Sequence, residues 1–139
     1  MKTQLIRTAI AVLTLTVAGY AQRPPQEMKV TVPFDFTVGS RVLPAGQYTF
    51  SKLSSEPSNT RALVIQSAAG AYVVTLANPV EPPRRQEIGK LVFHRYGDRY
   101  FLSEVWNPDR GSQLPASAQE RKLAQDSREA QATRIVAAR

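Results

Sequence analysis

His94 is the single histidine of this 139-residue chain, and imidazole is the side chain best suited to proton transfer near neutral pH. A site of the serine, histidine and aspartate type would therefore have to use His94. The residue sits among aromatic and aliphatic side chains, where a histidine is usually structural. The chain also lacks a Gly-x-Ser-x-Gly motif and a glycine-rich phosphate loop. We therefore expect a protein that is not an enzyme, and keep a hydrolase using His94 as an alternative.

Metal and cofactor chemistry is restricted by the same composition. The chain has no cysteine, which excludes a thiolate nucleophile, a cysteine-ligated zinc and an iron–sulfur cluster. One histidine excludes a site with two histidine ligands within one chain. The 11 acidic residues are scattered, and no Asp-x-Asp run suggests a calcium loop. We expect no cofactor and no metal site.

The remaining signal for binding is a basic segment with interleaved aromatic residues. The chain carries 18 Lys+Arg against 11 Asp+Glu, a formal net charge of +7. Basic and aromatic side chains on a sheet can bind single-stranded nucleic acid, and anionic polymers or lipid head groups suit the same field. The alternative is a solvated surface that only keeps the protein soluble. The candidate binding residues are Arg84, Arg85, Lys90, Arg95, Tyr96, Arg99 and Tyr100.

The first 21 residues have the three parts of a secretory signal peptide. Lys2 and Arg7 make a positive start, residues 8–18 are apolar, and Gly19 and Ala21 put small residues before the cleavage point. The apolar run is too short for a membrane span, which takes about 20 helical residues. We therefore expect signal cleavage, no transmembrane helix afterwards, and a periplasmic, cell-surface or secreted protein. An uncleaved anchor, the alternative, would need a longer apolar run.

Export narrows the choice of partner. Nucleic acid is not the usual partner outside the cytoplasm, so we expect none. The leading hypothesis is a non-enzymatic exported protein that binds or structures an anionic component of the cell envelope, either a polymer or lipid head groups. A second alternative is a carrier for a small apolar ligand, bound in a pocket between two sheets. Such a pocket would be lined by Phe34, Phe36, Phe93 and Trp106, whereas a packed core would favour the envelope protein.

The positions of these residues depend on a series of predicted strands. Apolar residues alternate along residues 30–38, where Pro33 indicates a sheet edge, a bend or a break. A turn at residues 43–46 precedes a strand that places Tyr48 and Phe50 on one face. Further strands at residues 61–67 and 71–76 form a predicted hairpin.

The clearest hairpin spans residues 89–106, with Gly97 and Asp98 as its two-residue loop. Regular pairing places Tyr96 opposite Arg99 and His94 opposite Phe101. One face, with Leu91, Phe93, Tyr100, Leu102 and Trp106, is the better core candidate. The other face is too apolar to be fully exposed to solvent, so we expect another segment to pack over part of it.

The chain divides into a signal peptide (1–21), a flexible lead-in (22–28), a β domain (29–106), a linker (107–115) and a C-terminal helix (116–139). Ser117 and Glu120 have the spacing of a capping box at the start of that helix. The helix either covers the second hairpin face or projects into solvent. The predicted fold is all-β, a small sandwich or flattened barrel of about six to seven antiparallel strands, followed by the C-terminal α-helix.

Two stretches carry a resemblance to known proteins. Residues 32–48 read VPFDFTVGSRVLPAGQY, and residues 89–106 read GKLVFHRYGDRYFLSEVW. They resemble a group of small exported β-rich bacterial proteins of uncharacterised function, over most of residues 30–106, and this resemblance implies no activity. The Leu-Pro-Ala-Gly-x-Tyr piece is similar to a turn and strand of immunoglobulin-like and prealbumin-like sandwiches, which supports the β architecture. The residues interpreted as core and turn determinants are Phe34, Gly39, Pro44, Gly46, Tyr48 and Gly97.

Overall fold

The computed structural model describes residues 27–53, 61–82, 84, 87–108, 110–126 and 132–138. The predicted signal peptide, nearly all of the lead-in and the candidate Arg85 lie outside this part of the chain. The elements in it are β1 (Met28–Val32), β2 (Phe36–Val38), β3 (Arg41–Leu43), β4 (Gly46–Lys52), β5 (Ala62–Ser67), β6 (Tyr72–Leu76), β7 (Asn78–Val80), β8 (Lys90–Tyr96), β9 (Arg99–Trp106), β10 (Gly111–Gln113), α1 (Ala118–Asp126) and β11 (Ala132–Ala137).

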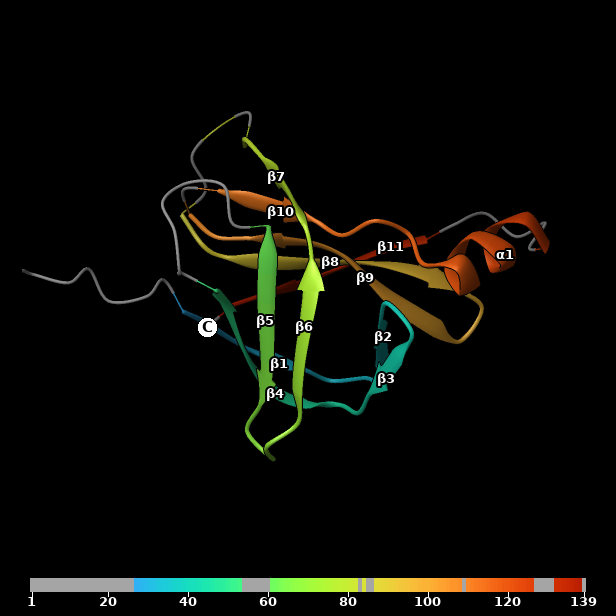
Figure 1. Ribbon diagram of the computed structural model, residues 1–139, viewed down its shortest axis with the longest axis horizontal. Helices are drawn as coiled ribbons and strands as arrows, with labels where there is room; N and C mark the ends of the chain where they lie inside the picture. The colour runs from blue at the N-terminus through green and yellow to red at the C-terminus, as the bar shows by residue number, and fades with distance from the viewer. Residues whose placement is uncertain are drawn as a thin grey trace, which may run out of the picture.

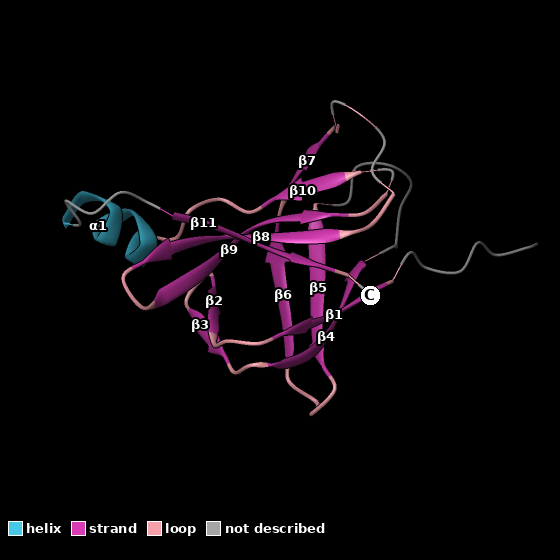
Figure 2. Ribbon diagram, turned by 180° about the vertical axis from the view of Figure 1, so that it is seen from behind, coloured by secondary structure: helices cyan, strands magenta, loops and turns pink. Residues whose placement is uncertain are grey.

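The strands form two sheets, which confirms the predicted all-β, sandwich-like fold followed by a C-terminal helix. The first sheet has the order β1-β4-β5-β6, and the second has the order β11-β8-β9-β10-β7 with β2 and β3 attached beside β9. Strands β5 and β6 cross the direction of β8 and β9 steeply, and α1 lies at one end of the second sheet (Figures 1 and 2).

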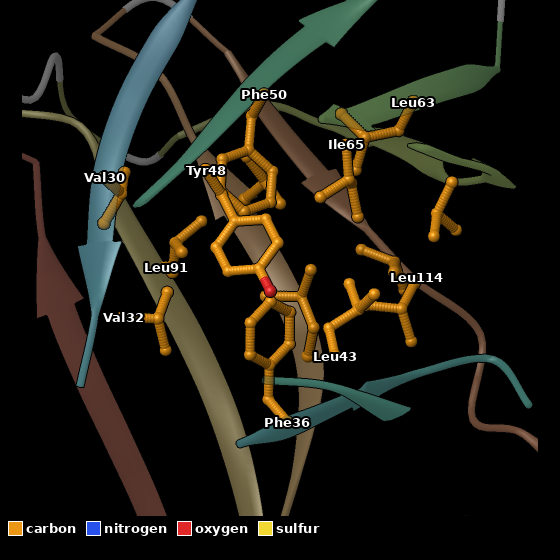
Figure 3. Close-up of a cluster of buried hydrophobic side chains, with 14 of the residues drawn as sticks. Val30, Val32, Phe36, Leu43, Tyr48, Phe50, Leu63, Ile65, Leu91 and Leu114 are labelled. Carbon is orange, nitrogen blue, oxygen red and sulfur yellow. The ribbon is translucent and has the colours of Figure 1, made fainter. Parts of the chain in front are cut away.

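The core lies between these two sheets and is built from alternate residues of the strands that face each other (Figure 3). In β1 the burial alternates strictly, so that Val30 and Val32 point inward. From the second sheet Leu91 and Phe93 are 0% exposed. Burying each such side chain contributes about 1.5–3 kcal/mol, so the alternating pattern specifies which face is inside.

Pro33 marks the point where the chain leaves one sheet for the other. The predicted continuous strand over residues 30–38 is broken there: β1 ends at Val32, and β2 begins at Phe36 in the second sheet. Because proline cannot donate a ladder hydrogen bond, the chain bends at this position. Phe34 lies in the connection, half-buried against the core.

The Leu-Pro-Ala-Gly-x-Tyr motif forms a closed corner between β3 and β4. The Tyr48 hydroxyl donates a hydrogen bond to the carbonyl of Pro44, and the Asp35 carboxylate accepts one from the Ala45 amide at 2.9 Å. The Tyr48 ring packs edge-on against Phe36, with centroids 5.1 Å apart (Figure 3). A tyrosine that bonds back to the backbone a few residues upstream is a known corner of β-sandwiches.

The predicted register of the β8–β9 hairpin is confirmed near its loop. Tyr96 pairs with Arg99 and His94 with Phe101, and Gly97 adopts a φ of 57°. Farther along, the register shifts between Val92 and Phe93. This irregularity moves Trp106 from the predicted core face to the opposite face, where it pairs with Lys90.

Residues 107–115, predicted as a linker, contain a strand. Strand β10 pairs with β9 and with β7, so backbone hydrogen bonds rather than an apolar pattern define it. Gly111 explains the close packing, because a Cβ there would lie 2.5 Å from the ring of Trp106. The linker prediction was wrong because glycine here permits a close approach instead of ending the sheet.

The predicted helix over residues 116–139 was wrong in its second half. Helix α1 ends at Asp126, and β11 pairs antiparallel with β8 along its whole length. The alanine-rich composition favours a helix, but pairing with the open edge of β8 and packing of Val136 against the core outweigh that propensity.

The strand count and direction also differ from the prediction. Eleven strands occur in the described residues instead of six to seven, since several span only three residues. The β domain begins at Met28, one residue earlier than expected, and extends past residue 106. One pairing, between β2 and β9 at Thr37 and Phe101, is parallel.

Replacing Tyr48 with phenylalanine tests the corner. The Tyr48→Phe variant loses the hydrogen bond to Pro44 from a side chain that is 1% exposed, and we expect the free energy of unfolding to fall by about 1–2 kcal/mol. Tyr72→Phe, at an exposed position on β6, is the matched control and should change it by less than about 0.5 kcal/mol. Urea denaturation measures both; equal losses would show that the corner has no special role.

Candidate functional site

The predicted basic and aromatic residues lie on two opposite faces of the β8–β9 hairpin. Arg95 and Tyr100 are a cross-strand pair on the face that carries Phe93 and Leu102 toward the core. The alternation of strand side chains places Lys90, Tyr96 and Arg99 on the opposite face. Arg84 is exposed and lies outside the strands. Near the hairpin loop, the predicted residues therefore form two separate pairs. Arg95 pairs with Tyr100 on one face, and Tyr96 pairs with Arg99 on the other.

Arg95 and Tyr100 belong to a larger group that we call the arginine–aromatic cluster: Phe34, Arg95, Tyr100 and Arg134. The rings of Phe34 and Tyr100 are stacked, with centroids 4.0 Å apart and an interplanar angle of 26°. The Arg134 guanidinium lies 4.7 Å from the Phe34 centroid, and the Arg95 guanidinium lies 5.7 Å from that of Tyr100. The Arg134 guanidinium also lies 5.7 Å from the Tyr100 centroid, so two cations contact one aromatic stack.

The core and the backbone hold this cluster in place. Phe34 packs edge-on against the fully buried Phe93, with centroids 5.1 Å apart. The Arg95 Nε–H donates to the carbonyl of Gly97 at 2.8 Å, and Arg134 donates from Nη1 to the Tyr100 hydroxyl at 3.3 Å. Each guanidinium is thus oriented by a hydrogen bond in addition to its contact with a ring.

The cluster has the chemistry of an anion-binding site. Both arginines are exposed, and within the described part of the chain neither guanidinium forms an ion pair with a carboxylate. A guanidinium presents several donors in a planar fork, which suits carboxylate and phosphate groups. An anion placed here meets donors that are already oriented, so it loses less free energy in ordering them.

Two members of the cluster were missed by sequence reasoning. Arg134 was assigned to a helix, and Phe34 was interpreted as a core residue or, in the carrier alternative, as part of the lining of an apolar pocket. The signal for Arg134 was the β-branched composition around it, since Thr133, Ile135 and Val136 favour a strand. Nothing in the sequence indicates that this strand pairs with β8, which is what brings Arg134 to Tyr100.

The opposite face of the hairpin carries a second polar group around Glu120. The Nδ1 atom of His94 lies 2.8 Å from Oε1 of Glu120, and the Tyr96 hydroxyl donates to the same oxygen at 3.4 Å. Glu120 is 5% exposed, although it belongs to the short helix α1. The start of α1 therefore covers part of the second hairpin face, one of the two arrangements left open by the sequence.

One of the two hydrogen bonds of the predicted capping box is present at the start of α1. The Ser117 hydroxyl accepts a hydrogen bond from the Glu120 amide at 3.1 Å. The Glu120 carboxylate, which would return to the Ser117 amide in a full capping box, instead bonds to His94 and Tyr96. The glutamate thus fixes the helix to the sheet.

Part of the arrangement required by the hydrolase alternative is present around His94. A cavity of about 290 Å³ is lined in part by His94, Ser103 and Glu120, and a carboxylate on Nδ1 orients the imidazole as a catalytic triad requires. In the described residues, however, no hydrogen bond joins the Ser103 hydroxyl to the His94 ring. The helix attachment already accounts for the pairing of His94 with Glu120.

The apolar-carrier alternative required a pocket lined by Phe34, Phe36, Phe93 and Trp106. Phe36 and Phe93 are instead packed against each other, with centroids 5.4 Å apart, and Phe34 rests on Phe93. Trp106 lies on the other face, where its Nε1–H donates to Glu104 at 2.6 Å. Aromatic side chains therefore fill the space that this alternative assigned to a ligand.

Comparisons with protein-family models, with curated proteins and with solved structures gave no match. The resemblance to small exported bacterial proteins therefore stays a prediction. The helix in the described residues, α1, has nine residues, and no helix in that part of the chain has the length and apolar character of a membrane span.

The Glu120 carboxylate affects the ionisation of Tyr96. Burial, the negative charge of Glu120 and the hydrogen bond to it raise the pKa of Tyr96 above its usual value of 10.0. We expect Glu120→Gln to lower the pKa of Tyr96 toward that value, whereas Glu104→Gln removes a carboxylate elsewhere and should leave it unchanged. The titration is followed by tyrosinate absorbance. The signal that is missing in the Tyr96→Phe variant is assigned to Tyr96.

The same shift has a consequence for stability. The pKa of Tyr96 is raised in the folded state. The contribution of Tyr96 to the free energy of unfolding is therefore complete below pH 10.0 and is lost as the pH rises through the folded-state pKa. The loss of stability above pH 10.0 should therefore be smaller in Tyr96→Phe. An unchanged Tyr96 titration in Glu120→Gln would contradict the contact between α1 and the sheet.

Proposed function

We propose that this chain is an exported, non-enzymatic protein that binds an anionic component of the cell envelope at the arginine–aromatic cluster. The observation that carries the proposal is the contact of two guanidinium groups, those of Arg95 and Arg134, with the stacked rings of Phe34 and Tyr100. Three distant parts of the sequence contribute to this arrangement: the connection after β1, the β8–β9 hairpin and β11. The signal-like residues 1–21 support export.

The cluster differs from an ordinary basic surface in the way that its charges are held. Isolated surface arginines are mobile, and ordering them costs side-chain entropy when a ligand binds. Arg95 and Arg134 are already oriented by a backbone carbonyl and a tyrosine hydroxyl. The excess of Lys+Arg over Asp+Glu adds long-range attraction that brings anionic surfaces toward the protein. Together, these features favour a carboxylate or phosphate ligand over a neutral one.

Phosphate or carboxylate groups are supplied in an envelope by lipid head groups and by acidic polymers. The two sources share the chemistry that the cluster recognises, and separate arms of one experiment distinguish them. The first arm uses vesicles of phosphatidylglycerol, with phosphatidylcholine vesicles as the neutral comparison. The second arm uses soluble polyphosphate as a polymer without a membrane.

The experiment compares two charge-matched double variants of the full chain. Arg95→Gln with Arg134→Gln removes the cluster cations, and Arg41→Gln with Arg121→Gln removes two exposed cations from β3 and α1. We expect the first pair to weaken binding to the preferred anion at least about tenfold, a difference of about 1.4 kcal/mol. The second pair should weaken it less than about threefold, because those charges act only at long range.

Binding is measured by sedimentation with vesicles and by calorimetry with polyphosphate, at low and at physiological salt. Weaker binding at the higher salt is expected for both anions, because exposed charges are screened. Equal losses in the two double variants would show that net charge alone drives binding. Binding to neither anion would remove the cluster as a site.

A further inference from the structure

A groove between β1 and β11 is a second feature of the described part of the chain that could bind a partner. Each strand is the last one of its sheet, so two sheet edges face the same space. Figures 1 and 2 show the start of β1 near the end of β11, beside the C-terminus, and the two strands diverge from there. The groove has a volume of about 600 Å³. It is lined by Lys29, Val30, Thr31, Pro33, Gln47, Arg134, Ile135, Val136 and Ala137.

The backbone of β11 presents unpaired groups to this groove. The Ala138 amide donates to the carbonyl of Gly89 at 2.8 Å, and the register places Ala137 opposite Lys90. In an antiparallel ladder the bonding direction alternates from residue to residue. Val136 therefore bonds toward β8, and the amides and carbonyls of Ile135 and Ala137 point away from it, into the groove.

Strand β1 also has unpaired backbone groups, on the edge that faces away from its neighbour β4. The amide of Ala68 donates to the carbonyl of Gln47 at 3.0 Å, so Gln47 bonds toward β5 and Tyr48 bonds toward β1. Val30 is the partner of Tyr48. The amides and carbonyls of Lys29 and Thr31 consequently point away from β4. No described strand pairs with them, and both residues line the groove.

We propose that this groove binds an extended acidic peptide by strand addition. An open strand edge offers main-chain donors and acceptors at the spacing that another strand requires. Lys29 and Arg134 supply positive charge at the groove, and its lining contains no carboxylate. Val136 and the 58% exposed Ile135 provide apolar surface for side chains of the peptide.

Charge complementarity selects the acidic peptide over a second copy of the chain. Each copy carries an excess of positive charge, so two copies meeting at a groove with Lys29 and Arg134 would repel each other. The inference rests on the proposed function, because Arg134 belongs both to the arginine–aromatic cluster and to the groove. It identifies the anionic partner as the acidic segment of another protein.

The first test uses synthetic peptides with the full chain. The probe is a capped octapeptide of alternating glutamate and valine, and its affinity is measured by calorimetry. The same peptide with N-methyl groups on alternate amides cannot donate main-chain hydrogen bonds along one of its edges. We expect this methylated peptide to bind at least about tenfold more weakly than the unmethylated one. A lysine–valine peptide of equal length should not bind.

The second test removes one outward amide at a time from the protein. Thr31→Pro and Ile135→Pro lose an amide that points into the groove, and proline is tolerated at such edge positions because no internal ladder bond is broken. Thr31→Val and Ile135→Val keep the amide and are the matched controls. We expect at least about a tenfold loss of peptide affinity in the proline variant of the edge that is used, and less than about a threefold loss in its control.

The outcomes separate this inference from the proposed function. If the N-methylated peptide and both proline variants bind as tightly as their controls, strand addition is wrong, even where the double variant of Arg95 and Arg134 still loses anion binding. No binding of the acidic peptide, with polyphosphate still bound, leads to the same conclusion. Concentration-dependent dimerisation that is lost in a proline variant would assign the groove to a second copy instead. If a proline variant does not fold, the comparison of the N-methylated with the unmethylated peptide on the unchanged protein still tests strand addition.

Discussion

The register of the β8–β9 hairpin is the constraint on which the other functional contacts depend. Gly97 takes a left-handed φ that a two-residue loop requires, and the loop sets Tyr96 against Arg99. From that starting point Arg95 must pair with Tyr100. A slip of one residue would send every side chain to the other face and separate the arginine–aromatic cluster into two halves.

Two connections elsewhere in the chain complete the cluster on this hairpin. The break at Pro33 carries the chain from one sheet to the other and leaves Phe34 where it stacks on Tyr100. Strand β11 returns along the open edge of β8 and adds Arg134. The same return places β11 opposite β1, which is why the groove and the cluster share an arginine. A basic surface and an open strand edge are therefore consequences of one topology.

The parts of the fold that sequence reasoning predicted are those governed by local rules. Alternation of apolar residues indicated which side chains of β1, β4 and β8 are buried, and turn residues located the hairpins. The loop length predicted the pairing of His94 with Phe101. Each of these depends on neighbours in sequence, so no knowledge of the rest of the chain was needed.

The parts that were missed depend on contacts between distant segments. Strand β10 exists because Gly111 can lie against the Trp106 ring, which no alternation reveals. Strand β11 has a helix-forming composition and becomes a strand because β8 offers it an edge. The candidate site was accordingly predicted in part: Arg95 and Tyr100 were identified, while Phe34 and Arg134 needed the tertiary structure.

The most direct test of anion binding at the arginine–aromatic cluster follows the arginine side chains by NMR as phosphatidylglycerol bicelles or polyphosphate are added to the full chain. If the anion binds at the cluster, the Nε–H signals of Arg95 and Arg134 shift together with the ring protons of Phe34 and Tyr100, and all of them saturate at one common affinity. Small, unsaturated shifts spread equally over exposed arginines such as Arg61 would contradict it, because they would show binding to the charged surface as a whole.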